Sequence, residues 1–338
     1  MRSVIPGPRE QSIPSAANLF KALVLIALLA GSFLAADLVL RAAQARAAEA
    51  PLMAALAWVA VGLFATFDVL LLIGMGVLAH DAVHRVLFRS SFWNEFWACV
   101  LSALALIPFY ANRQFHLTHH SAAHQPGRDP ENAMHNHGFL FAATAGSVIA
   151  LIEQYRYLLR NLARVTEPRY AGRAILDLIC VGSALWIYFG LVPLLGLSLA
   201  ATILPMLAVF PFVFSWRALS DHYGVPAIER AVRKGDVEEI DAEAWHHDRA
   251  RRQREVTGWV VLTSPWLEWL WSHVNYHEVH HKYPWLSHVY LKPVFTATRD
   301  SQPYLVVNGY WRSLLNLRRL HYYGARAPLR RFLSTPEW

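Results

Sequence analysis

The chain has 338 residues, of which 55% are hydrophobic and only 16% are charged. Soluble domains usually carry about 25% charged residues, so this composition disfavours an ordinary soluble enzyme and excludes a disordered or collagen-like chain. Two cysteines, Cys99 and Cys180, are too few for a disulfide scaffold, and both lie in apolar stretches where a free thiol packs as a small core residue. Histidine is abundant, with 17 copies, and several of them are clustered.

Four apolar segments are long enough to cross a membrane. A helix needs about 20 apolar residues to span a hydrocarbon core of about 30 Å. The segments that meet this requirement are 19–40, 51–79, 175–197 and 198–219. Two shorter apolar stretches, 92–110 and 138–152, predict re-entrant or surface-lying segments. The predicted fold class is therefore all-α integral membrane, and a stack of core helices in a soluble protein is the alternative.

The N-terminal region has the outline of a signal peptide, with basic residues before an apolar run. Its charged part is too long and its apolar run exceeds the usual 7–15 residues, so we expect the first span to be retained. Residues 1–18 are then a cytoplasmic segment, and residues 19–338 form a single membrane domain. Within that domain, residues 80–174 and 220–338 are expected to form a cytoplasmic cap.

The positive charges predict the orientation. Lys and Arg cluster before the first span, after the second and after the fourth, and the link between the third and fourth has none. We therefore expect both termini and the cap to face the cytoplasm, in a bacterial inner membrane. The C-terminal arginines favour contact with anionic membrane lipids, docking of an acidic redox protein, or simple solvation. They are Arg312, Arg318, Arg319, Arg326, Arg330 and Arg331. Nothing in the sequence indicates nucleic-acid binding.

The histidines of three clusters are spaced three or four residues apart, as on one face of a helix. They are His80 with His84, then His116, His119 and His120, and finally His277, His280 and His281. Residues three and four apart share one face of a helix. If one helix begins at Pro51, His80 is its thirtieth residue and lies about 45 Å along it. That position is about 15 Å beyond the hydrocarbon core, on the cytoplasmic side.

One further histidine, His222, follows the fourth span on the same side and brings the number of converging histidines to nine. Imidazole binds iron, zinc, copper and nickel, and nine rings suit two metal ions with four or five each. The sequence thus predicts a dinuclear metal site in the cap. The remaining histidines are interpreted as structural or solvent-facing, with His124 as the exception that could support a ligand. They are His124, His135, His137, His246, His247, His273, His288 and His321.

These clusters resemble those of the membrane fatty acid desaturases and their hydroxylase relatives. That family has an HxxxH, an HxxHH and a late HxxHH box, and this chain supplies HDAVH, HLTHH and HEVHH in that order. The similarity continues through HLTHHSAAHQPGRDPE at 116–131 and NYHEVHHKYP at 275–284. It covers about residues 80–291, and His222 resembles the isolated extra histidine after the family's fourth span.

The resemblance implies a diiron oxidase with O₂ as co-substrate and no catalytic residue beyond the metal centre. The implied ligands of the two Fe²⁺ ions are His80, His84, His116, His119, His120, His222, His277, His280 and His281. The implied substrate is a fatty acyl lipid, an acyl carrier or a free fatty acid, and we expect a separate electron donor such as a ferredoxin or a cytochrome b5-like protein. Zinc is a candidate substitute in purified protein because it outranks ferrous iron for such ligands.

The chemistry explains the residue types. An unactivated methylene has no acidic proton, so acid–base residues alone cannot remove its hydrogen, whereas two ferrous ions can convert O₂ to an oxidant that takes a hydrogen atom. Polar neighbours orient metal-bound rings, and the candidates are Asp81, Asp221, Glu278, Asn275 and His124. Candidates for the wall of an acyl tunnel are Tyr110, Trp266, Trp269 and Tyr276, although aromatic residues also form belts at membrane interfaces.

Two other classes of protein share part of this histidine pattern. The HExxH pattern of the last box matches a zinc metalloprotease, with His277 and His281 as ligands and Glu278 as general base, but it leaves the other boxes unexplained. A metal transporter or sensor should instead carry histidines inside its spans.

Within the family, hydroxylation, terminal-alkene formation by decarboxylation and carotenoid oxidation share the same boxes. The GRDPE segment is more similar to acyl desaturases, so desaturation is the predicted reaction.

Overall fold

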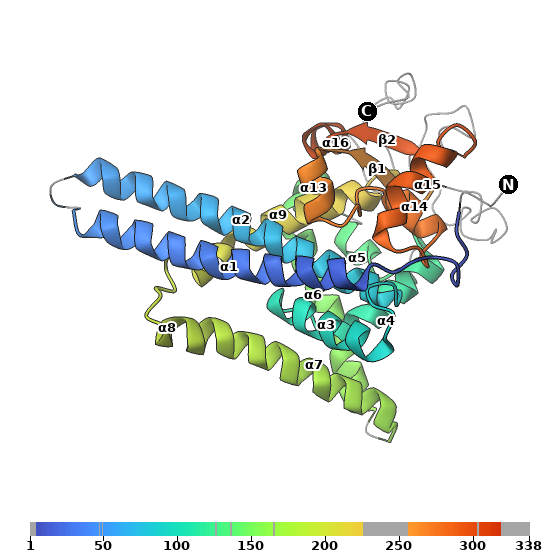
Figure 1. The fold of residues 1–338 in the computed structure, drawn as a ribbon, viewed down its shortest axis with the longest axis horizontal. Coiled ribbons are helices and arrows are strands. Elements are labelled where there is room, and N and C mark those ends of the chain that lie inside the picture. The colour runs from blue at the N-terminus through green and yellow to red at the C-terminus, as the bar shows by residue number, and fades with distance from the viewer. Residues whose placement is uncertain are drawn as a thin grey trace.

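A computed structural model describes residues 5–46, 48, 50–125, 127–135, 137–164, 166–225, 256–302 and 304–318. Helices dominate this part of the chain. The expectations for His246, His247 and His321, and for the arginines from 319 onward, fall outside the described residues. Figure 1 shows two long antiparallel helices, α1 and α2, extending away from a group of short elements, with α7 running along the same direction. The molecule therefore has an elongated helical part and a cap at one end.

Four helices are long and apolar enough to cross a membrane, as the sequence predicts. They are α1 (Ser15–Gln44), α2 (Pro51–Val83), the continuous run Pro168–Leu194 and α9 (Ile203–His222). The third run consists of α7 (Pro168–Trp186), the π-helical turn η1 (Ile187–Leu191) and α8 (Val192–Leu194). Residues 199–202 form turns, so the fourth helix begins at 203 and not at 198.

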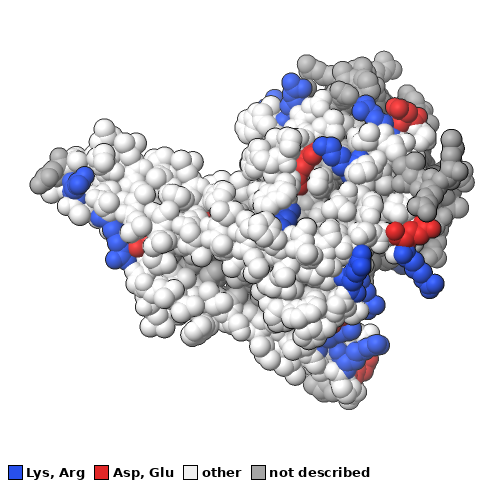
Figure 2. Space-filling view, viewed as in Figure 1, with Lys and Arg blue, Asp and Glu red and all other residues white. Residues whose placement is uncertain are grey.

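The surface of these helices suits a lipid environment. Large apolar side chains are exposed along them, including Leu34, Leu63 and Ile179, which are 50%, 67% and 57% exposed. On the face shown in Figure 2, charged side chains gather at the ends of the long helices and over the cap, and the surface between is almost free of charge. Exposed apolar patches of this extent are unusual in soluble monomers, and together with the helix lengths they indicate a membrane protein.

The two shorter apolar stretches form further helices. The first becomes α3 (Ser91–Leu104) and α4 (Phe109–Ala122), whose axes meet at 97° and which together are also long and apolar enough for a broken span or a re-entrant loop. The second begins α6 (Phe139–Ala163), which follows the short α5 (Asn132–His135). Within the described residues, α2 packs against α1, α3 and α9, so it lies at the centre of the bundle.

The fold is mostly helical, as predicted, but the cap also contains a small two-stranded sheet that the all-α expectation did not include. Strand β1 (Trp259–Leu262) pairs in parallel with β2 (Leu305–Asn308), with Trp259 opposite Leu305. Their sequences, WVVL and LVVN, are short runs rich in β-branched residues, which favour strands. Parallel strands need a long crossover, which here contains α13 (Pro265–Leu270), α14 (His277–Lys282), η2 (His288–Tyr290) and α15 (Leu291–Thr298). After β2 the chain enters α16 (Tyr310–Leu317).

Candidate metal centre

The first histidine box lies at the end of α2. That helix begins at Pro51 as expected, so His80 is its thirtieth residue, and His84 is the residue that ends it. The turn that follows is held by the buried Asn94. Its Oδ1 accepts from the Leu87 and Phe88 N–H groups at 3.2 and 3.1 Å, and its Nδ2 donates to the Ala82 carbonyl at 2.8 Å. The end of α2 is thereby fixed where the histidines lie.

The second box lies on α4, whose start is capped from another helix. The carboxylate of Asp177 on α7 accepts from the N–H groups of Tyr110 and Ala111, at 2.9 and 3.0 Å. A carboxylate stabilises a helix N-terminus because it satisfies unpaired N–H groups and opposes the positive end of the helix dipole. Asp177 therefore positions the helix that presents His116, His119 and His120.

The third box and His222 approach each other over a glycine. His222 ends α9 and His277 begins α14. A Cβ on Gly258 would lie 3.1 Å from the carbonyl oxygen of Asp221 and 3.2 Å from Cδ2 of His277. The backbone before β1 passes so close to both elements that a larger residue would push them apart.

All nine histidines converge in two adjacent sets. The five-histidine set consists of His80, His84, His116, His120 and His280, whose nearest ring nitrogens lie within 4.8 Å of one another. The same criterion groups His119, His222 and His281. His277 joins these three because its Nε2 is 2.8 Å from that of His222 and 3.2 Å from that of His281. We call these four rings the four-histidine set. The two sets touch where His120 stacks on His281, with ring centroids 4.2 Å apart.

Each HxxHH box is divided between the sets. In the second box, His116 and His120 belong to the five-histidine set and His119 to the other. In the third box, His280 belongs to the five-histidine set, whereas His277 and His281 belong to the four-histidine set. The i and i+4 rings thus serve one set while the i+3 ring serves its neighbour, so a single helical face spans both sets.

The proton positions in the four-histidine set call for a cation. Nδ1 of His222 lies 2.7 Å from the Thr257 carbonyl oxygen, and Nδ1 of His119 lies 3.0 Å from Asp129 Oδ1. These oxygens accept, so both rings carry a proton on Nδ1 and a lone pair on Nε2. The two Nε2 atoms are 3.1 Å apart, and facing lone pairs repel unless a proton or a metal ion lies between them. Ligand nitrogens about 2.0–2.1 Å from one metal ion are themselves about 3 Å apart, so the spacing fits a metal ion.

Charge around His119 favours such a cation. Burial opposes a positive charge on this ring, but the carboxylates of Asp129 and Glu131 outweigh burial and raise the pKa of His119 to about 9. The same negative charges stabilise a metal ion in that position. For five other rings of the site, burial lowers the pKa well below its usual value, which keeps them in the neutral form that binds metals. They are His116, His120, His277, His280 and His281.

Glu131 lies between the two sets and was not singled out by sequence reasoning. Its Oε2 is 3.8 Å from Nε2 of His119 and from Nε2 of His222, and its Oε1 is 4.0 Å from Nδ1 of His116. Asp129 holds this segment, because its two oxygens accept from the N–H groups of Glu131 at 2.9 Å and of His124 at 2.7 Å. The only signal in the sequence was the acidic DPE segment after the second box.

Two of the expected ring-orienting residues act through Thr257. Glu278 Oε2 accepts from the N–H groups of Thr257 and Gly258, both at 2.7 Å, and from the Thr257 hydroxyl at 3.0 Å. Nε2 of His124 donates to the Thr257 carbonyl at 2.7 Å, the same oxygen that accepts from His222. Both side chains therefore hold the carbonyl that orients a ring of the four-histidine set.

The other three candidates have partners away from the rings they were expected to orient. Asp81 Oδ2 pairs with Nδ1 of His288 at 2.6 Å, and Asp221 Oδ2 pairs with Nη1 of Arg217 at 2.7 Å. The Asn275 amide donates to a carbonyl of β1 at 2.9 Å. Asp81 and Asp221 are next to ligand histidines in sequence, but successive side chains on a helix point in different directions.

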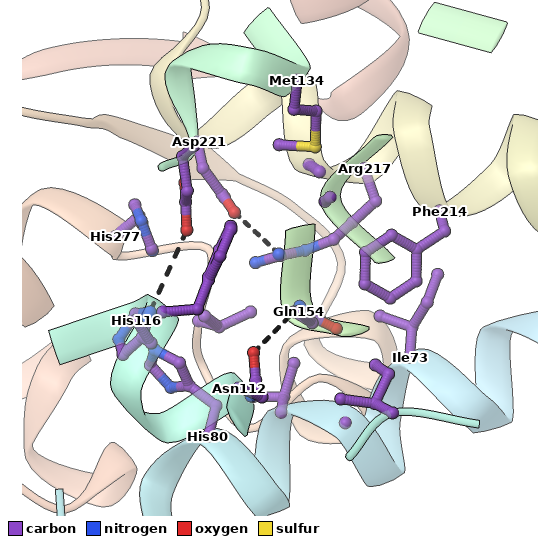
Figure 3. Close-up of a pocket in the computed structure, with 18 residues that line it drawn as sticks. Ile73, His80, Asn112, His116, Met134, Gln154, Phe214, Arg217, Asp221 and His277 are labelled. Atoms are coloured by element: carbon purple, nitrogen blue, oxygen red, sulfur yellow. Dashed lines mark hydrogen bonds and ion pairs between the residues drawn. The ribbon is translucent and has the colours of Figure 1, made fainter. Parts of the chain in front are cut away.

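A cavity of about 130 Å³ reaches one ring from each box, His80, His116 and His277. Its remaining wall is partly apolar and partly polar. The apolar side chains are Ile73, Val77, Ile107, Phe115, Met134, Ala150, Phe214, Ala218 and Val274, and the polar ones are Asn112, Glu131, Gln154, Arg217 and Asp221. Figure 3 shows the histidines on one side of this cavity and Phe214 and Ile73 on the other.

None of the four aromatic tunnel candidates lines this cavity. The hydroxyl of Tyr110 donates to Glu95 at 3.2 Å, and that of Tyr276 donates to Glu268 at 2.8 Å. Trp266 and Trp269 are 59% and 45% exposed. Both tryptophans therefore present aromatic surface to the outside, which is also a feature of membrane-interface belts.

The family model for fatty acid desaturases matches residues 50–312. This range is more than three quarters of the chain and contains all nine histidines. The chain belongs to the fatty acid desaturase family. Membership indicates an oxidoreductase of the fatty acid desaturase or hydroxylase type, and the family's diiron centres agree with a histidine cluster able to bind metal. No curated protein sequence matches the chain significantly.

The metalloprotease alternative does not fit this site. In that motif the glutamate is the general base, whereas here Glu278 is fully buried and its Oε2 accepts from the backbone N–H groups of Thr257 and Gly258. Its Oε1 lies 3.3 Å from Nζ of Lys282. In addition, His280 belongs to a set built mainly by the other boxes, which an isolated HExxH zinc site would leave without a role.

Proposed function

We propose that this protein is an O₂-dependent diiron oxidase that desaturates fatty acyl chains in the membrane. The observation that carries the proposal is the pair of adjacent histidine sets, in which buried ring nitrogens face one another at about metal-ligand spacing beside a partly apolar cavity. Nitrogen ligands of this kind suit iron. An all-histidine pair of sets has no evident use in acid–base or nucleophilic catalysis.

In this proposal the five-histidine set holds one Fe²⁺ and the four-histidine set holds the other. Glu131 is proposed as an oxygen ligand of the second ion, since its carboxylate faces two rings of that set at 3.8 Å. The negative charges of Asp129 and Glu131 partly offset the positive charge of two buried metal ions. Zinc is expected to occupy the same ligands in protein purified without added iron.

The proposed reaction removes two hydrogens from adjacent carbons. One O₂, two electrons and two protons are consumed with each CH₂–CH₂ unit, and one CH=CH unit and two water molecules are formed. Two iron ions, when bound, would supply the redox chemistry that activates O₂, which is the oxidant. The protein's part is to orient the ligand rings through Asp129 and Thr257, and to keep the acyl chain dry against side chains such as Val77 and Phe214.

The electrons are proposed to come from a separate donor, such as a ferredoxin or a cytochrome b5-like protein. We propose that the cap and both termini face the cytoplasm of a bacterial cell, where such donors occur, with the protein in the inner membrane. Residues 19–338 are proposed to act as one membrane domain. The positively charged flanks of the spans support this orientation.

The experiment is untargeted mass spectrometry of lipids and volatile hydrocarbons from cells that express the chain or its His280→Ala variant. A product that lacks two hydrogens, present only with the unaltered chain, is the expected result. Its double-bond position would locate the reacting carbons. An added oxygen, a shortened terminal alkene or an oxidised carotenoid would replace desaturation by one of the other reactions of this site. Identical products from both chains would overturn the proposal.

A further inference from the structure

The cavity beside the histidines contains a buried guanidinium with unused donors. Arg217 lies on α9, is 8% exposed and lines the cavity. Its Nη1 pairs with Asp221 at 2.7 Å, but Nε and Nη2 are buried and have no hydrogen-bond partner among the described residues. Figure 3 shows the side chain reaching from α9 into the cavity toward Asp221.

The two unused donors form one edge of the guanidinium. Nε–H and Nη2–H point in nearly the same direction, and this edge matches the two oxygens of a carboxylate. Asp221 already balances the charge of Arg217, but buried donors without acceptors are costly, so the Nε and Nη2 groups call for an acceptor with two oxygens. Asp221 binds at Nη1, and the buried Tyr310 hydroxyl, which also makes no regular hydrogen bond, lies near the guanidinium.

The rest of the cavity suits an alkyl chain. Its wall on α2 contains Ile73, Gly76 and Val77, which lie on the same helical face as His80. Phe115 and Phe214 add aromatic surface from α4 and α9. A molecule with a carboxylate at one end and methylenes beyond it would satisfy both the guanidinium edge and these apolar side chains.

We propose that Arg217 binds the carboxylate of the substrate through Nε and Nη2, so that the protein acts on free fatty acids and not on thioesters or glycerolipid esters. This inference rests on the proposed function and narrows its substrate class. His80, His116 and His277 line the same cavity as Arg217. The carbons next to the carboxylate therefore lie beside the metal centre, and oxidation is expected near the carboxyl end of the chain.

Binding is the measurement that tests this inference separately from oxidation. Metal-loaded protein in nanodiscs is titrated under nitrogen with dodecanoate, methyl dodecanoate or acetate. We expect dodecanoate to bind at least tenfold more tightly than its methyl ester, because charge-assisted hydrogen bonds add that much affinity or more. The Arg217→Gln variant should lose this preference. Acetate should bind far more weakly than dodecanoate, because it has no alkyl chain for the apolar wall.

Three further variants control for folding and charge. Arg217→Gln combined with Asp221→Asn removes the ion pair without leaving a buried charge, and it should also lose the preference for the acid. Arg217→Lys keeps the charge but lacks the two-donor edge, so an intermediate preference is expected. Arg156→Gln alters an exposed arginine on α6, outside the cavity, and should bind as the unaltered chain does.

The outcomes also separate this inference from the proposed function. Equal binding of acid and ester to the unaltered chain, or an unchanged preference in folded, metal-loaded Arg217→Gln and in the double variant, would overturn the role of Arg217. Acetate binding as tight as dodecanoate would reduce the site to a general anion site and overturn the assignment to fatty acids. Selective acid binding without any oxidised product would instead leave this inference standing and remove the proposed reaction.

Discussion

The two histidine sets differ in how their rings are held. In the four-histidine set, Asp129 and the Thr257 carbonyl accept from Nδ1 of His119 and His222, which leaves Nε2 free for a metal ion. In the five-histidine set, both ring nitrogens of His80 are buried without a hydrogen-bond partner among the described residues. Glu131 lies 3.8 Å from two rings of the four-histidine set and 4.0 Å from only one ring of the other. Although Nδ1 of His277 also has no partner, the set with fewer nitrogens has more negative and oriented neighbours.

We infer from this difference that the five-histidine set relies on the number of its ligands and the four-histidine set on the groups that support them. Five neutral nitrogens can hold an ion by number, whereas four nitrogens gain from a nearby carboxylate and from rings fixed in one tautomer. If so, changes to Glu131, Asp129 and Glu278 should weaken the four-histidine set and spare the other. Loss of a ring should affect the set to which it belongs.

The largest effect is expected when a single ring is removed from either set. His222→Ala and His280→Ala should each lower the metal content and reduce turnover by more than the about 100-fold seen when only supporting groups are lost. Metal analysis and product formation measure this. His137→Ala is the matched control, because that exposed histidine belongs to neither set. Full metal content together with full turnover in either variant would remove that histidine from the ligands.

Glu131→Gln should have the next largest effect. The amide keeps the shape but loses the negative charge that faces His119 and His222, so metal retention by the four-histidine set should fall by about 10–100-fold. A chelator titration of the cobalt-loaded protein, followed by absorption, would resolve the two sets. Glu153→Gln, on α6 and away from the histidines, is the control. Equal retention in both variants would mean that Glu131 is not a ligand.

Asp129→Asn should weaken the same set less. The amide oxygen can still accept from Nδ1 of His119, so the tautomer is kept, but the charge and the hydrogen bond from the His124 N–H to Oδ2 are lost. We expect a loss of metal affinity near the lower end of the about 10–100-fold range for supporting groups, measured by the same titration. Asp300→Asn serves as control, since the Asp300 side chain is 98% exposed. A loss confined to the five-histidine set would contradict the assignment.

Local sequence patterns predicted the helices that carry the histidine boxes. Helical periodicity placed His80 at the end of one long helix and each of the other boxes on one helical face, and apolar length predicted four spans. The sequence could not predict that the i+3 ring of each HxxHH box joins the neighbouring set, because this depends on how α4 and α14 face each other. The support from Asp177 and Thr257 was hidden for the same reason, since each joins segments far apart in the chain.

The misplaced candidates show a related limit. Aromatic residues near the third box suggested a tunnel, but proximity in sequence cannot separate a cavity wall from a membrane belt, and Trp266 faces outward. Arg217 drew no attention because an arginine at the end of a span is ordinary. Only the tertiary structure shows that its side chain turns into the cavity.

Glu278→Gln should have the smallest effect on turnover. Its carboxylate supports Thr257 and Gly258 by hydrogen bonds, so the substitution removes charge-assisted bonds and should cost about 1–3 kcal/mol of stability. The metal centre itself keeps all its ligands, so a folded sample should retain substantial activity, measured beside thermal unfolding. Glu167→Gln, at an exposed position, should change neither. Weaker support of one carbonyl should not abolish turnover while all nine rings are intact. Complete loss of turnover in folded, metal-loaded Glu278→Gln would therefore mean that this carboxylate takes part in the reaction, as the metalloprotease alternative requires.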